Sequence, residues 1–492
     1  MRQKFKQQTQ NISEIEIPTN SRNRIYPALI TMQEIYKRKR SVIDSVYSDL
    51  LKEYSNTTND VIEPTLSDFF PDSEDYPQEN FKNLGASGMT AWQTFVAVTL
   101  RQLLNFTYDD LEFSFNHNNL VREFLELPSC DHELFSQSRL GKNCRKVSPE
   151  TIQVINDAVI DLSIEMGFED GKDIRSDSFA CKTNIHHPSD TKAIEDGCNK
   201  ILQLCVSLTK GEDGWRQYED WRKKIKSLVR ELIQCKKSRK KNKVLKNFKI
   251  KNAYKKLIKK ARQLLKKGFD TWEADLTNIT EKTDLSYYMC CLEMILDLTE
   301  RRIIKNEDIQ KSEKIFSIFE SHTELIHRGK FPIPIEYGHR VVVSEGKSGM
   351  ILDHKVMENG VLDQEEYIPL LKRLKERYGK LRTISLDKGY NSKGLKNIDL
   401  SEYVESQILP SKGYKNKAVK EHESTPSFIK LRMWRAGVES CIGTLMQAHG
   451  ADKCRDKCYR GFRRWVSACV LSRNLVTLGR LILEQRSDQK VA

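Results

Sequence analysis

The sequence has no uninterrupted run of 18 apolar residues, the length that a membrane-spanning helix needs. Its basic first stretch, "MRQKFKQQTQ", lacks the apolar segment of a secretory signal. The 12 cysteines are scattered and form no closely spaced framework, which predicts reduced thiols rather than a disulfide scaffold. Internal repeats are also absent. Together these absences predict a cytoplasmic protein that does not use a membrane.

Acidic residues are nearly missing from residues 222–267, where 21 Lys or Arg face one acid, Glu231. This segment alone has a net charge of +20. The whole chain has a net charge of +14, so the remaining residues together have a net charge of about −6. A charge run is commonly just a solvated helix face. Charge at this density, however, opposes compaction unless a polyanion neutralises it, and a phosphate backbone is the obvious candidate. The cations that we predict to contact DNA here are Lys236, Lys237, Arg239, Lys240 and Lys241.

The length of 492 residues is too great for one ordinary core and predicts two to four domains. Residues 1–80 have the pattern of an N-terminal arm and linker. Residues 81–170 contain several short helices in series, which fits a helix-turn-helix DNA reader and fits plain helical packing equally well. Strand-like residues 171–190 then lead into a helical, basic stretch at 191–325. Residues 326–485 return to strands and helices and end in a long helix.

The order of the expected elements defines the fold class. A strand at 173–184 is followed by the helical stretch, a hairpin at 339–360 and a helix at 366–379. Two further strands, a helix and the C-terminal helix complete the chain. This order predicts an α/β fold with a helical insertion and an N-terminal helical domain. Capping residues support the N-terminal helices, with Thr107 and Ser148 at expected N-caps.

Three acids stand where a structural role explains them poorly. Asp177 lies inside a strand, where Asp is disfavoured, and Asp387 lies at the C-terminal end of a strand, where open α/β sheets bind ligands. Glu439 lies on a helix one turn after Arg435. Each acid alone has an ordinary explanation as a turn cap or a solvated side chain. All three together in a basic protein indicate a Mg²⁺ site, because clustered carboxylates bind hard cations that act on phosphates.

The motifs around these acids resemble those of bacterial insertion-sequence DDE transposases of the ISNCY type. The similarity covers roughly residues 85–485 and rests on these segments: "SDSFACKTNIHHPSDTKAIEDG", "KIFSIFESHTELIHRGK", "EYGHRVVVSEGKSGMILDHKVMENG", "ISLDKGYNS", "WRAGVESCIGTL" and "RGFRRWVSACVLSRNLVTL". The resemblance implies an RNase H-like mixed sheet with helices on both faces. It also implies that Asp177, Asp387 and Glu439 are the catalytic acids, separated by 210 and 52 residues. The long first spacing contains the basic insertion.

The same resemblance implies an activity and its partners. The enzyme would cut double-stranded DNA at the terminal inverted repeats of its element and join the ends to target DNA, acting as a homo-oligomer associated with the bacterial nucleoid. The three acids would hold two Mg²⁺ ions, with Mn²⁺ as an alternative. Further DNA contacts would come from Arg435, Lys388, Asn391, Arg463 and Arg464.

One position departs from the family pattern. Relatives often carry a lysine seven residues after the glutamate as a DNA contact, and this chain has Met446 there. The alternative function is therefore a transposase-derived DNA-binding protein without strand transfer. The adjacent pair His186 and His187 suggests a metal site at first sight, but neighbouring side chains in an extended turn point apart and Mg²⁺ prefers oxygen. We interpret this pair as a structural turn.

Overall fold

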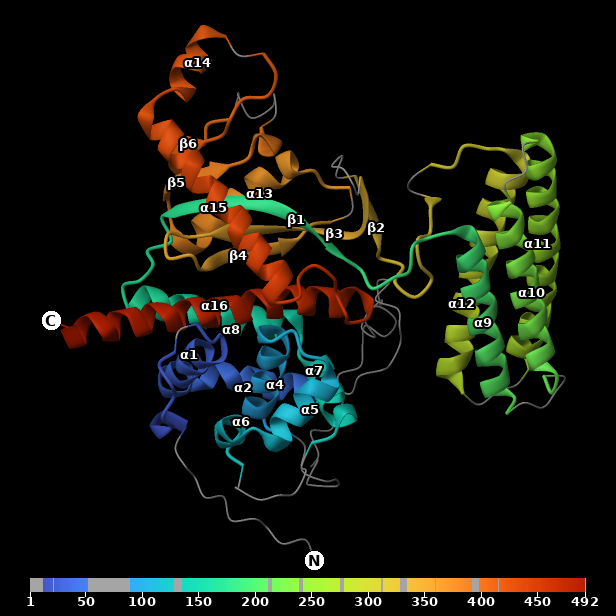
Figure 1. The fold of residues 1–492 in the computed structure, drawn as a ribbon, viewed down its shortest axis with the longest axis horizontal. Coiled ribbons are helices and arrows are strands. Elements are labelled where there is room, and N and C mark those ends of the chain that lie inside the picture. The colour runs from blue at the N-terminus through green and yellow to red at the C-terminus, as the bar shows by residue number, and fades with distance from the viewer. Residues whose placement is uncertain are drawn as a thin grey trace, which may run out of the picture. The chain divides into compact units, whose positions relative to one another are not determined.

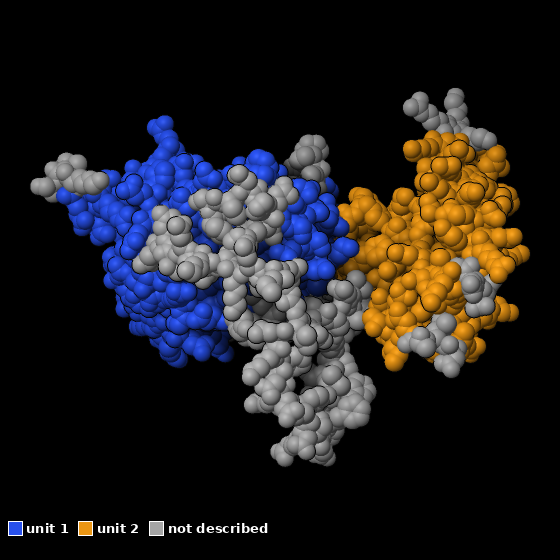
Figure 2. Space-filling view, turned by 90° about the horizontal axis from the view of Figure 1, so that it is seen from below, with its two compact units in different colours: residues 1–55, 64–184, 324–492 blue, residues 56–63, 185–323 orange. Residues whose placement is uncertain are grey.

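A computed structural model gives the fold (Figure 1). It describes residues 12–20, 22–51, 89–127, 135–210, 215–238, 242–274, 278–310, 313–327, 334–358, 360–391, 398–414 and 416–491. The chain forms two compact units, coloured separately in Figure 2. Unit 2 comprises residues 56–63 and 185–323, and unit 1 contains the rest. The boundaries predicted for the insertion, 191–325, thus differ by a few residues from those of the main segment of unit 2, 185–323.

Unit 1 is built on a mixed six-stranded sheet. Its strands are β1 (Asp173–Lys182), β2 (Glu324–His327), β3 (Ile335–Glu345), β4 (Ile351–Val356), β5 (Leu381–Leu386) and β6 (Val404–Ile408). The order is β2-β3-β1-β5-β6, and β4 also pairs with β3. β1 is antiparallel to β3 and parallel to β5, which is parallel to β6. The predicted α/β class and the predicted strands and hairpin are confirmed.

Helices cover both faces of this sheet because its strands carry apolar side chains on both faces. Ile174 of β1 faces one core together with residues of α13 (Asp363–Tyr378). Phe179 and Cys181 of β1 face a second core, which is completed by α15 (Pro426–Ala448) and α16 (Cys458–Val491). Side chains at odd positions of β1 therefore point toward α15 and those at even positions toward α13.

The N-terminal helices belong to the same unit and share its first core. They are α1 (Ile25–Arg38), α2 (Arg40–Leu51), α4 (Ala91–Leu103), α5 (Tyr108–His117), α6 (Asn119–Phe124), α7 (Gln137–Lys146) and α8 (Pro149–Glu165). Thr107 and Ser148 cap α5 and α8 through their side chains, as predicted. Helix α1 is deeply buried, so this part of residues 1–80 is not a loose arm. The linker part of this predicted segment, within residues 52–80, lies outside the described residues.

Helix α16 fills the centre of unit 1. Its residues Cys458–Gln489 are long and apolar enough for a membrane span, and 78% of its most apolar window is buried inside the protein. The buried side chains include Phe462, Trp465 and Leu475, which pack against the sheet and the N-terminal helices. Burial of this kind is what a core helix requires.

Unit 2 is a helical bundle of α9 (Asp190–Leu208), α10 (Tyr218–Lys237), α11 (Lys243–Glu273) and α12 (Ile279–Thr299), followed by the π-helical turn η2 (Glu300–Lys305). Its own apolar core includes Leu232, Leu257 and Leu292, each fully buried. Asn242 and Asn278 cap α11 and α12. The basic segment thus folds because each helix has a separate apolar stripe to bury.

Candidate active site

The strand register brings the first two acids together. β1 and β5 run parallel, and their last paired residues are Ser176 and Leu386. Asp177 follows Ser176 within β1, and Asp387 follows Leu386 just after β5 ends, so the two acids lie next to the last paired residues. Asp177 is at an odd position, and its side chain points toward α15. The backbone N–H of Ser178 donates a hydrogen bond of 2.8 Å to its Oδ1.

One arginine of α15 joins all three predicted catalytic acids. Arg435 donates a short charged hydrogen bond from Nη2 to Asp177 Oδ2. Its Nη1 lies 3.7 Å from Asp387 Oδ1 and 3.9 Å from Glu439 Oε1. The Arg435 side chain is 13% exposed, whereas that of Glu439 is 72% exposed. Three acids that are far apart in sequence therefore converge on one cation.

The position of α15 depends on a close helix–strand approach. Arg175 of β1 donates to Glu345 Oε2 at 2.7 Å and to the carbonyl of Trp434 at 2.6 Å. A Cβ at Gly437 would collide with this Arg175 guanidinium. The glycine of the "RAGVE" motif thus lets α15 lie against β1, which puts Arg435 and Glu439 over Asp177.

The turn after β5 forms one wall of the site. Asp387 precedes a short 3-10 turn, Lys388–Tyr390, whose tyrosine is 1% exposed. A depression of about 490 Å³ adjoins Asp387 and is lined by Lys388, Gly389, Ser411, Lys412 and Gly413. Two lysines beside a catalytic-type carboxylate suit an anionic substrate.

A fourth carboxylate adjoins the site, and sequence reasoning missed it. Asp363 begins α13, and its Oδ1 accepts a 2.8 Å hydrogen bond from the Ser178 hydroxyl. A Cβ on Gly389 would lie 3.5 Å from Asp363 Oδ2 and 3.8 Å from Asp387 Oδ2, so both carboxylates face this glycine. In the sequence, Asp363 looks like an ordinary first-turn acid of a helix.

The electrostatics single out Asp177. Burial raises its pKa, Arg435 and the Ser178 N–H oppose this shift, and the charges of Asp387 and Asp363 add to it. Burial likewise raises the pKa of Tyr390 well above its usual value, with Asp363 and Asp177 contributing. Its phenol oxygen is buried without a hydrogen-bond partner among the described residues. Desolvation and like charge at one point are typical of functional sites.

The donor set fits a hard divalent cation in its chemistry, because Asp177, Asp387 and Glu439 offer carboxylate oxygens only. Within the described ranges, no group of three or more His, Cys, Asp or Glu is arranged to hold a metal ion. The guanidinium of Arg435 is the cation that the three acids share.

Three of the residues predicted to contact DNA in unit 1 are Lys388, Asn391 and Arg463. Lys388 is exposed. Asn391 donates to the carbonyl of Pro410 at 3.1 Å, which holds its turn. Arg463 is 45% exposed and pairs with Glu150 at 2.9 Å. These three residues stay predictions as DNA contacts.

Arg464 requires a correction. It is 6% exposed, its Nη2 lies 2.8 Å from Asp456 Oδ2, and its Nη1 donates to the carbonyl of Arg145 at 2.7 Å. Arg101 pairs with the same aspartate at 2.9 Å. Because its guanidinium is enclosed and its donors are used inside the protein, we assign Arg464 a structural role in place of the predicted DNA contact.

Lys236 is also used within unit 2. It donates to Thr191 Oγ1 at 2.8 Å and to the Tyr254 hydroxyl at 2.7 Å, so it links three helices. Lys237, the next residue, is exposed. Residues 239–241, which contain the remaining predicted cations of this cluster, lie outside the described residues. Lys236 is itself exposed, so it links these helices and stays a predicted DNA contact.

The histidine pair, His186 and His187, lies in the segment between β1 and α9. His186 Nε2 lies 3.4 Å from Asp196 Oδ2 of α9, across an exposed surface. His187 precedes the residues that lead into α9 at Asp190. This contact agrees with the structural interpretation of the turn.

Comparison of the chain with protein-family models, with curated proteins and with solved structures finds no match in any of the three. The interpretation of the site therefore depends on its geometry and chemistry.

Proposed function

We propose that this protein is a metal-dependent DNA transposase that cuts the ends of its element and joins them to target DNA by phosphoryl transfer. The observation that carries the proposal is the convergence of Asp177, Asp387 and Glu439 on the Arg435 guanidinium. Such an arrangement concentrates oxygen ligands and one positive group at a single point. Phosphoryl transfer needs little more from a protein than positioning and charge stabilisation.

The sheet supports an RNase H-like assignment of the fold. Its first three long strands, β1, β3 and β4, form an antiparallel meander, and β5 and β6 follow in parallel with β1 on its other side. This strand order and these directions are those expected for the RNase H-like sheet that the motif resemblance implies. The acids would then lie in the middle of the central strand, just after its parallel neighbour and on a covering helix.

Each residue has a definite task in the proposed reaction. Asp177, Asp387 and Glu439 would hold Mg²⁺ or Mn²⁺, and the bound ions would activate the attacking oxygen and stabilise the leaving one. Lys388 and Lys412, beside Asp387, would hold phosphate oxygens of the DNA strand. Arg435 would keep the acids together before the metal arrives and would pair with a carboxylate or a phosphate afterwards.

A second candidate is a DNA-binding protein of transposase origin that does not carry out strand transfer. Met446 favours it, because this residue replaces the family's lysine and packs against the core of Phe462 and Trp465. The DNA contact expected at this position is therefore missing, while the acids remain.

Incubation of the protein with labelled DNA ends and Mg²⁺ separates the two candidates. A transposase gives cleaved ends and joined products, and Asp177→Asn, Asp387→Asn and Glu439→Gln each lower the rate more than about 100-fold. The DNA-binding protein gives salt-sensitive complexes and no product. Circular dichroism of each variant shows whether the fold is retained.

A further inference from the structure

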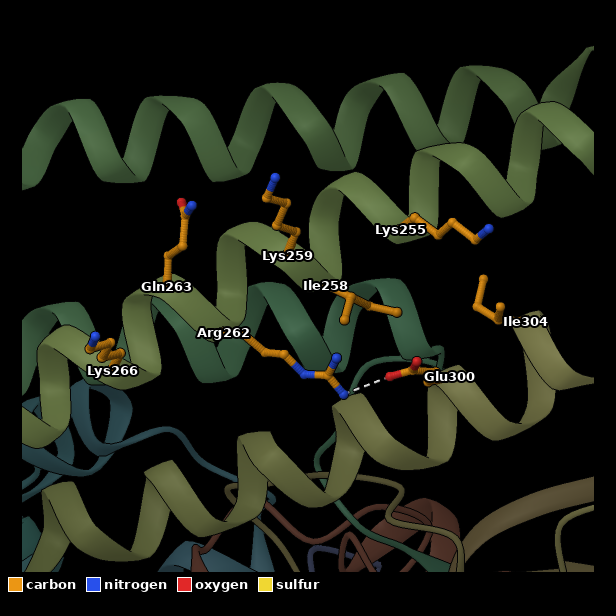
Figure 3. Close-up of a pocket in the computed structure, with 8 residues that line it drawn as sticks. All are labelled: Lys255, Ile258, Lys259, Arg262, Gln263, Lys266, Glu300 and Ile304. Atoms are coloured by element: carbon orange, nitrogen blue, oxygen red, sulfur yellow. Dashed lines mark hydrogen bonds and ion pairs between the residues drawn. The ribbon is translucent and has the colours of Figure 1, made fainter.

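A basic groove lies on helix α11 of unit 2, far along the sequence from the catalytic acids. Its volume is about 510 Å³. We call it the α11 groove and define it by the residues that line it: Lys255, Ile258, Lys259, Arg262, Gln263, Lys266, Glu300 and Ile304 (Figure 3). Four of these side chains are cationic and one is anionic, so the lining is strongly positive.

The cations form one stripe of the helix. Lys255, Lys259, Arg262 and Lys266 are separated by four, three and four residues, which places them on one face of α11. At about 1.5 Å per residue the stripe is about 16 Å long. Phosphates of one strand of duplex DNA succeed each other at about 3.4 Å along the axis, so the stripe spans about five of them.

Three other lysines of α11 have a different task. Lys260 and Lys267 lie over the rings of Trp221 and Trp215, at 3.4 and 4.5 Å from the ring centroids. Lys256 pairs with Glu231 at 2.7 Å. These side chains cover apolar surface or neutralise an acid, which leaves them poorly placed for a ligand.

The groove lysines differ from these neighbours. Within the described part of the chain, Lys255, Lys259 and Lys266 have no hydrogen bond or ion pair. Only Arg262 is paired, through Nη2 to Glu300 Oε2 at 2.6 Å, and Figure 3 shows it extending from α11 to this glutamate. Three unpaired positive charges therefore lie along the groove, and Ile258 and Ile304 provide an apolar part of its lining.

We propose that the α11 groove binds the phosphodiester backbone of duplex DNA. A row of cations on one helix face, three of them without partners among the described residues, suits an extended polyanion, and a single small anion would neutralise only one or two of them. The proposal deepens the proposed function by locating a DNA-holding surface in the insertion, and it rests on that function for the choice of DNA as the polyanion. It adds a stripe of α11 to the contacts expected at Lys236 and its neighbours, which lie earlier in the chain.

The salt dependence of binding tests this assignment. We would measure the affinity of the full-length protein for a 30-base-pair duplex in EDTA by fluorescence anisotropy, across a range of NaCl. Each phosphate contact contributes about 0.9 to the slope of log K against log salt. The triple variant Lys255→Gln, Lys259→Gln, Lys266→Gln should therefore lose about 2.7 from the magnitude of the slope. At 0.15 M salt its affinity should fall by about 100-fold relative to the parent protein.

A charge-matched control separates the groove from net charge. The triple variant Lys192→Gln, Lys256→Gln, Lys417→Gln also removes three positive charges, but from lysines near acids: Glu195 at 2.6 Å, Glu231 at 2.7 Å and Glu421 at 4.0 Å. We expect its slope to change by less than about 1. Equal slopes for the two triple variants, or an unchanged slope for the groove variant, would overturn the assignment.

Two further outcomes keep this test apart from that of the proposed function. Binding is measured in EDTA, where metal-dependent cleavage cannot occur. The binding result therefore does not depend on whether the protein cleaves DNA. If polyglutamate displaced the protein from DNA as well as an equal charge of duplex DNA does, the groove would be a general anion surface and the assignment to DNA would be wrong. Thermal melting of the groove variant, with solvent-exposed substitutions only, should match that of the parent.

Discussion

Replacing the shared arginine, by Arg435→Gln, should make the stability of the protein depend on Mg²⁺. Removing one partner of a buried ion pair costs about 3–5 kcal/mol. Asp177 keeps 20% exposure and the Ser178 N–H, so we expect about 2–3 kcal/mol from this contact. The contacts to Asp387 and Glu439 are longer and more exposed, and each adds at most about 0.5 kcal/mol.

The variant should therefore lose about 3 kcal/mol of unfolding free energy without metal. A ligand at 100 times its dissociation constant restores about 2.7 kcal/mol, so saturating Mg²⁺ should recover most of the loss. The parent protein should gain less from Mg²⁺, because its acids already have a cation. Urea unfolding followed by tryptophan fluorescence, with Mg²⁺ or with EDTA, measures both differences.

Arg432→Gln is the matched control, since Arg432 is exposed on the same helix, three residues before Arg435. Its stability should change by less than about 0.5 kcal/mol and should not respond to Mg²⁺. The reasoning would be refuted if Arg435→Gln lost the same stability with and without Mg²⁺. It would also be refuted if the control behaved like the variant.

Two further predictions concern the acids around Asp177. Asp363→Asn should lower Mg²⁺ affinity or cleavage rate by about 10–100-fold, because it removes a charge beside the proposed metal ligands, whereas Glu376→Gln on the exposed side of α13 should have no effect. Calorimetric titration with Mg²⁺ would contradict this if both variants bound alike. The raised pKa of Asp177 gives the pH dependence: the carboxyl is protonated below that pKa and must lose its proton to bind a cation, so Mg²⁺ affinity should rise with pH through the acidic range. An affinity that stays level between pH 4 and pH 7 would remove Asp177 from the metal site.

The strands and the principal helices could be predicted from the sequence because their signals are local. Apolar runs in "RVVVSE" and "RTISL" follow the strand pattern, and Ser148 with Pro149 is a typical helix start. Several elements, among them β2, α7 and α14 (Lys417–Glu423), were missed because they lack a clear local signal. Strand β2 has four residues and depends on pairing with β3, and α7 is too polar to have a clear apolar stripe.

The site could be predicted only in part. The three acids stand out by position, but their convergence on Arg435 depends on the register of β1 and β5 and on the packing of α15. Asp363 gives no sequence signal of its own, because acids at helix starts are common. Arg464 gives a signal that points to the wrong environment. In "RGFRRW" it looks like part of a basic surface, but it is buried on α16 against Asp456. The role of such residues depends on partners that are distant in the chain, which a local sequence pattern does not identify.

We propose that Asp177, Asp387 and Glu439 form one metal-dependent active site for DNA strand cleavage and transfer. The most direct measurement is the rate of cleavage and joining of labelled DNA ends in Mg²⁺, for the parent protein and for Asp387→Asn. Asp387 follows the end of β5 and is 41% exposed, whereas Asp177 is 20% exposed, so this variant should leave the fold intact. The account predicts Mg²⁺-dependent products from the parent and a loss of more than about 100-fold in the variant. Equal rates for the two proteins would contradict it.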